Sequence, residues 1–184
     1  DFRLDPPGFG GGASLHDKQA DMLLAFIGET GRVLFADDIT DSSYLQQLKK
    51  EILHVMSCAD QIRSYLMSDP DYVAFAHPNL NIDNAFWWRD EQGVLDAGLI
   101  DWSGFHGTEV ASMLDMCLFA GEWPMQQRHQ TTLLQAFIDA YRAAGGPTIS
   151  LHQLTFRLDL TLALSWGGQI GVPPLIYREL PRAE

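Results

Sequence analysis

Helical periodicity runs through most of this chain and limits the folds that it can adopt. Between Leu45 and Leu66, apolar residues recur at steps of three and four, which predicts an amphipathic helix over 43–67. The same periodicity predicts further helices over 15–28, 109–120, 125–144 and 150–166. Patterns typical of strands are confined to 72–102. We therefore expect a mostly α-helical α+β fold.

The strand-like part of the sequence predicts a small central β-hairpin. Its two strands are expected over 85–88 and 94–102, separated by a polar turn, and a shorter β-like run covers 72–76. Clustered glycines predict a loop over 1–13, and glycines with prolines predict an extended C-terminal tail over 167–184. Because no linker divides the 184 residues, we expect a single domain.

Composition and charge exclude several classes of partner. Apolar residues make up 46% and charged residues 20% of the chain, which is typical of a globular protein. The formal net charge of −12 argues against binding nucleic acid, because phosphates require a basic surface. The charge-free segment 160–177 is interrupted by glycines and prolines, so we expect no transmembrane segment. Two cysteines make no disulfide framework, which favours a soluble protein of a reducing compartment over a secreted one.

A polar loop between the expected strands holds the residues best suited to catalysis or metal binding. It reads His77-Pro78-Asn79-Leu80-Asn81-Ile82-Asp83-Asn84, and the second strand of the hairpin ends in Leu99-Ile100-Asp101-Trp102. An Asn at the start of one strand and an Asp at the end of its partner can converge on one end of a hairpin. Asn84 and Asp101 would there offer an amide and a carboxylate oxygen to a divalent cation, completed by phosphate oxygens and water.

This pattern resembles the catalytic centre of the aminoglycoside phosphotransferase and choline kinase family, a branch of the protein-kinase-like fold. The family's loop typically reads His-Gly-Asp-x-His-x-x-Asn, and its metal-binding element reads Ile-Asp-Trp or Ile-Asp-Phe. The resemblance covers roughly 43–166 and implies a kinase-like C-terminal lobe. It further implies that Asn84 and Asp101 are the metal ligands and that His77 braces the catalytic loop.

The chain departs from the family at positions that matter for catalysis. Asn79 stands where the family has its catalytic Asp, Asn81 where it often has a second His, and Pro78 where it usually has Gly. An amide can orient an acceptor hydroxyl but cannot take its proton, and general-base assistance is typically worth about 10²–10⁴ in rate. A nucleotide-binding lobe also needs a Gly-rich hairpin and a strand lysine. All three lysines fall instead in expected helices: Lys18, Lys49 and Lys50.

Each of these residues also has a purely structural interpretation. His77 can brace a loop in any fold, and the asparagines can form turns by bonding their own backbone. Asp101 can cap the segment that follows it, and Asp83 lies on the far side of the loop by count, which disfavours it as a substitute base. A metal-hydrolase cluster of these residues with His106 lacks the spacing of zinc ligands. The tryptophans are expected in a core or an interface: Trp87, Trp88, Trp102, Trp123 and Trp166.

Three functions are compatible with these features, and the first is favoured. It is a non-catalytic, pseudokinase-like member of the family that acts as a binding or scaffold subunit, with Asn79 and His77 at the catalytic positions. The second is an active ATP-dependent small-molecule phosphotransferase, acting on a hydroxyl group, whose N-terminal lobe is absent from this chain. The third is an unrelated helical interaction domain. We expect no cofactor in this chain alone, Mg²⁺ and ATP only in a complete active form, and a protein partner or larger assembly, docked over the cleft or along 167–177.

Overall fold

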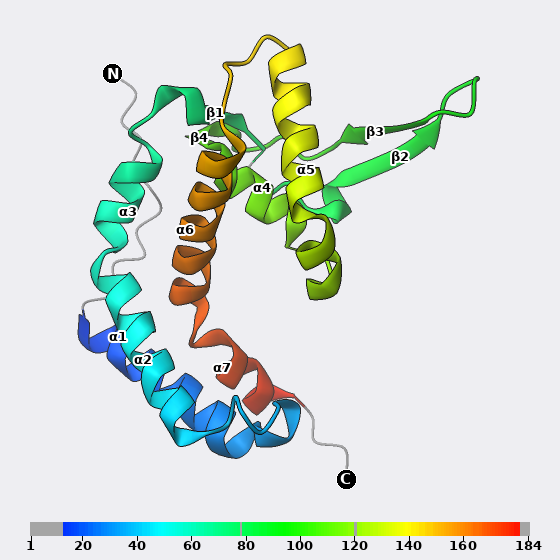
Figure 1. Ribbon diagram of the computed structural model, residues 1–184. Helices are drawn as coiled ribbons and strands as arrows, with labels where there is room; N and C mark the ends of the chain where they lie inside the picture. Colours follow the sequence, from blue (N-terminus) through cyan, green and yellow to red (C-terminus); the bar gives the residue numbers. More distant parts are fainter. Residues whose placement is uncertain (1–12, 78, 120, 181–184) are drawn as a thin grey trace. The chain divides into compact units, whose positions relative to one another are not determined.

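The computed structural model describes residues 13–77, 79–119 and 121–180 (Figure 1). Helices make up most of the described chain, and its strands form two antiparallel sheets of two strands each. This confirms the expected α+β class that is mostly α-helical. The loop predicted over 1–13 lies outside the described residues except for Ala13, which begins the first helix.

The chain divides into two compact units, which we describe separately. Unit 1 comprises Asp1–Ile62 and Ala163–Glu184, and unit 2 comprises Arg63–Leu162. The single domain expected from the sequence stays a prediction.

Unit 1 is built from helices. It contains α1 (Ala13–Ala25), a π-helical turn (Phe26–Thr30), a 3-10 turn (Arg32–Leu34), α2 (Ser42–Ser57) and α7 (Val172–Glu179). Two further helices contribute to both units: α3 (Ala59–Leu66) and α6 (Leu151–Gln169).

Aromatic packing and an ion pair hold the helices of unit 1 together. The buried ring of Phe26 meets the ring of Tyr177 from α7 at a centroid distance of 5.1 Å. α1 and α2 pack against each other, and Lys49 Nζ lies 3.0 Å from Asp17 Oδ1. Gly167 of α6 allows a close approach, because a Cβ atom there would lie 2.6 Å from the sulfur of Met56.

The long helix predicted over 43–67 is interrupted at one residue. Cys58, with φ −97° and ψ 2°, ends α2, and its N–H is shared between the carbonyl of His54 at 3.2 Å and that of Val55 at 3.0 Å, which tightens the last turn. α3 begins at the next residue. Because the interruption adds no residues, the apolar period continues across it, which is why the sequence pattern predicts one helix.

The extended tail predicted over 167–184 is wrong for its described part. α6 continues through the glycines to Gln169, and α7 covers Val172–Glu179. Pro173 and Pro174 occupy the first positions of α7, where a missing N–H removes no intrahelical hydrogen bond. Prolines that the sequence analysis treated as breakers therefore begin a helix.

Unit 2 combines the two small sheets with three helices and the end of α3. Strands β1 (Val73–Ala76) and β4 (His106–Glu109) pair antiparallel, with Ala76 opposite His106. Strands β2 (Ala85–Arg89) and β3 (Leu95–Leu99) form the predicted hairpin, with Trp87 opposite Ala97. The helices are α4 (Val110–Leu118), α5 (Trp123–Ala143) and the unit's part of α6. β4 was not predicted, since His-Gly-Thr-Glu lacks apolar alternation.

The core of unit 2 lies where α4, α5 and α6 meet β1 (Figure 1). It is a cluster of buried apolar side chains from the three helices and from the connections before β1 and α6: Tyr72, Val110, Ala111, Leu114, Leu134, Ile138, Ile149, Leu154 and Leu158. No helix within the described ranges is long and apolar enough to cross a membrane. Both cysteines are free thiols.

Asp41 caps α2, and its removal should measurably destabilise the protein. Its carboxylate accepts hydrogen bonds from the backbone N–H of Ser43 at 2.8 Å and of Tyr44 at 3.3 Å. We expect Asp41→Ala to lower the free energy of unfolding by about 1 kcal/mol, the usual cost of losing such a cap. Asp41→Asn, which keeps an acceptor oxygen, should cost much less. Urea unfolding measures both, and equal losses would contradict the capping role.

Candidate functional site

His77 ties the start of the polar loop to the end of the hairpin. It follows β1 and is only 3% exposed. Its Nδ1 accepts a hydrogen bond from the backbone N–H of Asn79 at 3.2 Å, so the ring proton lies on Nε2. Nε2 can then donate to the carbonyl oxygen of Ile100, 2.7 Å away. The ring also meets Trp102 edge-on, with centroids 5.0 Å apart. One buried side chain thus holds both ends of the candidate site.

Backbone pairing places positions 84 and 101 at the same end of the hairpin. The register of β2 and β3 sets Ala85 opposite Leu99, and the N–H of Ile100 donates to the carbonyl of Asn84 at 3.0 Å. Asn84 is therefore opposite Ile100, and Asp101 is the next residue along. The predicted convergence agrees with this register, while the assignment of both residues as metal ligands stays a prediction.

The Asn84 side chain is oriented by the loop that precedes it. Its Nδ2 donates to the carbonyl oxygen of Asn79 at 2.8 Å, and this bond turns its Oδ1 away from that carbonyl. The oxygen is the atom that a hard cation would require. The same bond closes the loop between Asn79 and Asn84, so the turn-forming role proposed for the asparagines is also present here.

Asp101 occupies an unusual backbone conformation. Its φ is +57°, the left-handed region that non-glycine residues seldom adopt, although Asp and Asn tolerate it better than most. This turn leads the chain out of β3. The exposed carboxylate accepts a hydrogen bond from the Ser103 hydroxyl at 2.6 Å. Such outliers concentrate at functional sites, and here the outlier falls on the predicted metal ligand.

Asn79 is exposed and its side chain is already engaged. Its Oδ1 accepts a hydrogen bond from Nδ2 of Asn81 at 2.9 Å. The two departures from the phosphotransferase pattern therefore bond to each other. Position 79 can orient a neighbouring group through its remaining N–H bonds, but it offers no atom that accepts a proton near neutral pH.

The residues present fit a magnesium ion only in part. Asn84 and Asp101 supply two oxygen ligands, and a hard cation needs about six, so substrate phosphates and water would have to complete the shell. No group of three His, Cys, Asp or Glu side chains that could hold a metal occurs in the described part of the chain. His77 cannot join such a group because both its ring nitrogens are engaged. The lysines lie in α1 and α2, outside unit 2.

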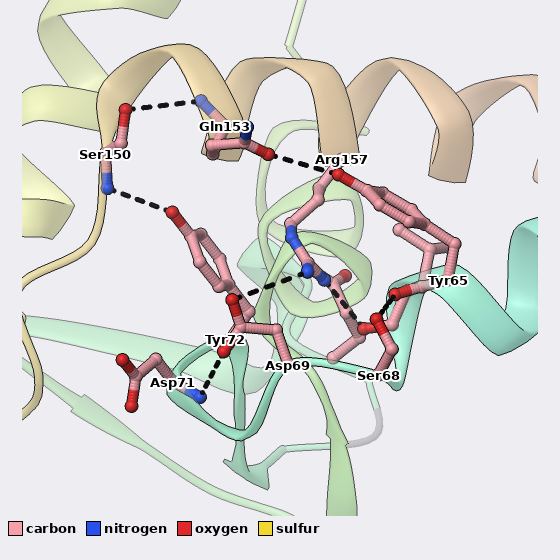
Figure 2. Close-up of polar contacts among 10 residues, drawn as sticks. Tyr65, Ser68, Asp69, Asp71, Tyr72, Ser150, Gln153 and Arg157 are labelled. Atoms are coloured by element: carbon pink, nitrogen blue, oxygen red, sulfur yellow. Dashed lines mark hydrogen bonds and ion pairs between the residues drawn. The ribbon is translucent and has the colours of Figure 1, made fainter.

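A second polar cluster, which the sequence analysis missed, surrounds the guanidinium of Arg157 in unit 2 (Figure 2). Arg157 is 2% exposed and projects from α6. Its Nη1 donates to the carbonyl oxygen of Leu66 at 2.7 Å, the last residue of α3. The guanidinium lies 4.2 Å from the ring centroid of Tyr72 and 5.0 Å from that of Tyr65. The hydroxyl of Tyr72 accepts the N–H of Ser150 at 3.0 Å.

Glu109 faces this arginine from the start of α4. It is 2% exposed, and its Oε1 lies 3.8 Å from Nη1 of Arg157, an ion-pair distance rather than a hydrogen bond. Its Oε2 accepts the backbone N–H of Ser112 at 3.2 Å, while Oε1 has no hydrogen-bond partner in the described structure. Burial raises the pKa of Glu109 to about 7, and the bonds to Ser112 and the charge of Arg157 only partly oppose this.

The sequence contained a signal for this cluster. Leu154, Leu158 and Thr161 share the buried face of α6 with Arg157, at the spacing of one helical stripe. A single arginine on an apolar stripe indicates a buried cation that requires partners from elsewhere in the fold. Those partners come from three separate segments, which no local pattern identifies.

The tryptophans are exposed rather than part of a core. Exposed indole rings occur at all five positions: Trp87, Trp88, Trp102, Trp123 and Trp166. The core alternative of the sequence analysis is therefore wrong, and the interface alternative stays open.

Comparison with known proteins identified no relative. No family model, no curated protein and no solved structure matches the chain. The resemblance to phosphotransferases therefore depends on the loop residues and stays a prediction.

Loss of His77 should destabilise unit 2. His77→Ala removes both ring hydrogen bonds and leaves the carbonyl of Ile100 without this donor, for which we expect a loss of about 1–3 kcal/mol in the free energy of unfolding. His106 lies opposite Ala76 on the neighbouring strand and is exposed, so His106→Ala is the matched control and should change stability little. Urea denaturation followed by circular dichroism compares the two. Equal effects would show that His77 is not a brace.

The raised pKa of Glu109 predicts a stability that falls with rising pH. The folded protein keeps a proton on Glu109 up to about pH 7, whereas the unfolded chain loses it near its ordinary value of 4.5. Between these values the unfolded state binds fewer protons, so the free energy of unfolding decreases, by up to about 3 kcal/mol for this group. Glu109→Gln should flatten the decrease.

Glu122 provides the control for this experiment. It precedes α5 as Glu109 precedes α4, but it is exposed and makes no capping hydrogen bond through its side chain. Glu122→Gln should therefore leave the pH dependence of unfolding unchanged. A wild-type protein whose stability rises across this pH window would contradict the burial of an uncompensated Glu109.

Proposed function

We propose that this chain is a non-catalytic, phosphotransferase-like binding subunit. The observation that carries the proposal is that His77 holds the polar loop in place, while an amide, Asn79, stands at the position expected for the catalytic base. His77 fastens the loop to Ile100, beside Asp101, and so supports the resemblance. Asn79 supplies no carboxylate, which supports the loss of catalysis.

The nucleotide chemistry of an active enzyme has little support in unit 2. A transferred phosphoryl group needs positive charge to cradle the donor phosphates. Unit 2 contains no lysine, and its buried arginine, Arg157, is committed to the carbonyl of Leu66 and the rings of two tyrosines. The two oxygen ligands at Asn84 and Asp101 would bind magnesium weakly without phosphates. We therefore propose a protein that retains part of the metal site but does not catalyse phosphoryl transfer.

The exposed aromatic residues support a role in binding. Trp87 is 58% exposed, and apolar neighbours on the same hairpin share this exposure: Phe86, Trp88, Val94, Leu95 and Ile100. Apolar rings exposed on both faces of one hairpin are typical of an interaction surface. If turnover is found, the active phosphotransferase is the alternative. If the loop binds no cation, the alternative is an unrelated interaction domain.

Turnover measurements separate the first two functions. We expect no measurable ATP hydrolysis by the purified chain, by Asn79→Asp or by its matched control Asn81→Asp, because the donor phosphates are not held. Calorimetry with ATP and Mg²⁺ should show no binding in the micromolar range. Brisk hydrolysis by the wild type that Asp101→Ala abolishes would establish the active phosphotransferase instead.

Manganese titration followed by NMR tests the cation site directly. Paramagnetic Mn²⁺ should broaden the amide signals of Asn84 and Asp101 before that of Asp96, an exposed acid of the same hairpin. Asp101→Asn should abolish this preference, since it removes the carboxylate, which is the charged ligand of the pair, whereas Asp96→Asn should not. Equal broadening at all acidic positions would reject the metal assignment and favour the unrelated interaction domain.

A further inference from the structure

The two edges of the β2–β3 hairpin differ in their free hydrogen-bonding groups. In an antiparallel pair, residues alternate between those bonded across the ladder and those whose N–H and C=O point outward. The bonds from Ile100 N–H to Asn84 and from Asp90 N–H to Val94 fix this alternation. Phe86 and Trp88 therefore bond inward, and Trp87 and Arg89 point their backbone groups away from β3.

The outer edge of β3 is partly occupied by its own neighbours. The outward N–H of Ala97 donates to the carboxylate of Asp96 at 2.8 Å. The outward carbonyl of Leu99 accepts a hydrogen bond from the indole N–H of Trp102 at 3.2 Å. Local side chains that take up backbone groups are one way in which an edge strand is protected from pairing.

The outer edge of β2 has no such protection over its central residues. The N–H of Ala85 donates to the carbonyl of Ile82, but within the described residues no hydrogen bond reaches the outward backbone groups of Trp87 and Arg89. Both faces beside this edge carry exposed apolar rings. The rings of Phe86 and Trp88 stack at 5.2 Å on one face, and Trp87 lies on the other. A two-stranded sheet is marginal in water, so a third strand here would gain hydrogen bonds and apolar contacts.

We propose that the outer edge of β2 binds a basic, strand-forming segment of a partner protein. The inference rests on the proposed role as a binding subunit and specifies its site. Backbone pairing along an open edge provides affinity, and side chains provide specificity. β2 is five residues long, so the segment is short, with apolar residues at its centre beside Phe86, Trp87 and Trp88.

The acidic character of the hairpin favours a basic partner over a second copy of the chain. Residues 83–101 carry one basic side chain, Arg89, and acidic side chains at both ends of β2 and on β3: Asp83, Asp90, Glu91, Asp96 and Asp101. Two such hairpins would bring like charges together, which destabilises a pair of strands. Basic residues at the ends of an added strand would instead face acids at both ends of β2.

A synthetic strand tests the proposal with three peptides. The probe is Lys-Val-Tyr-Val-Lys with blocked ends, titrated into the isotope-labelled chain and followed by NMR. Its acidic counterpart is Glu-Val-Tyr-Val-Glu, and its backbone control is the lysine peptide methylated at every amide nitrogen. We expect the lysine peptide to protect the amides of Trp87 and Arg89 from exchange. Each control should bind at least about tenfold more weakly, the equivalent of about 1.4 kcal/mol.

Variants on opposite edges of the same rung provide the matched comparison. Trp87→Pro removes an outward N–H and leaves the ladder bonds of Phe86 and Trp88 intact, an arrangement that edge strands tolerate. It should weaken the lysine peptide by about tenfold or more. Ala97→Pro removes the outward N–H directly opposite, which already bonds to Asp96, and should leave binding unchanged. Trp87→Val keeps the N–H and isolates the contribution of the indole.

Several results would overturn the proposal. These are failure of the lysine peptide to bind, equal binding of the acidic or methylated peptide, unchanged binding to Trp87→Pro, or protection on β3 in place of β2. If Trp87→Pro does not fold, the methylated peptide still decides the outcome. A free protein of twice the chain mass with the Trp87 amide already protected would assign the edge to a second copy. ATP hydrolysis would reject the proposed function but would leave this peptide result valid.

Discussion

The guanidinium of Arg157 is the interaction on which the arrangement of unit 2 most depends. A buried cation is costly unless several groups compensate for its lost hydration. Here the carbonyl of Leu66 at the end of α3, Glu109 at the start of α4 and the face of Tyr72 before β1 all contact it. A cation at a helix C-terminus is also favoured by the helix dipole. The arginine thus fixes the end of one helix, the start of another and the segment leading to β1.

This compensation is incomplete, and the incompleteness has a chemical consequence. Nε of Arg157 and Oε1 of Glu109 are buried without hydrogen-bond partners in the described structure. An ion pair at 3.8 Å between two buried side chains does not repay the desolvation of both charges. Glu109 therefore keeps its proton toward neutral pH, while the guanidinium of Arg157 lies against the rings of Tyr72 and Tyr65. Glu109 thus behaves more as a protonated acid beside Arg157 than as its salt-bridge partner, whereas Oδ2 of Asp69 lies at an ion-pair distance of 4.0 Å from Nη2 of Arg157.

Local patterns in the sequence predicted the elements whose information lies within a few residues. The hairpin and the helices expected over 43–67 and 125–144 follow from neighbouring residues. The break at Cys58 and the pairing of β4 with β1 were missed, because they depend on tertiary packing and on partners distant along the chain. α7 was missed because proline is read as a breaker unless the first turn of a helix is already known.

For the candidate site, the sequence predicted where residues lie in the hairpin better than it predicted their conformations and hydrogen bonds. Spacing was sufficient to bring Asn84 and Asp101 to one end of the hairpin, because strand register follows from the turn. The left-handed φ of Asp101 and the bond between Asn79 and Asn81 were not predictable, since each depends on how the loop closes. Residue spacing therefore predicted the backbone positions of the loop residues, but not the hydrogen bonds that their side chains make.

The hairpin is held at both ends, and this explains why its middle can remain open. At the turn, Asp90 accepts the N–H groups of Gln92 and Val94, and Gly93 supplies a φ of +80° that other residues avoid. At the other end His77 bonds to Ile100. Two strands that share so little buried surface would otherwise separate readily. Because hydrogen bonds at both ends stabilise the hairpin, β2 does not need to bury its outer edge against its own unit. That edge is left available for another strand.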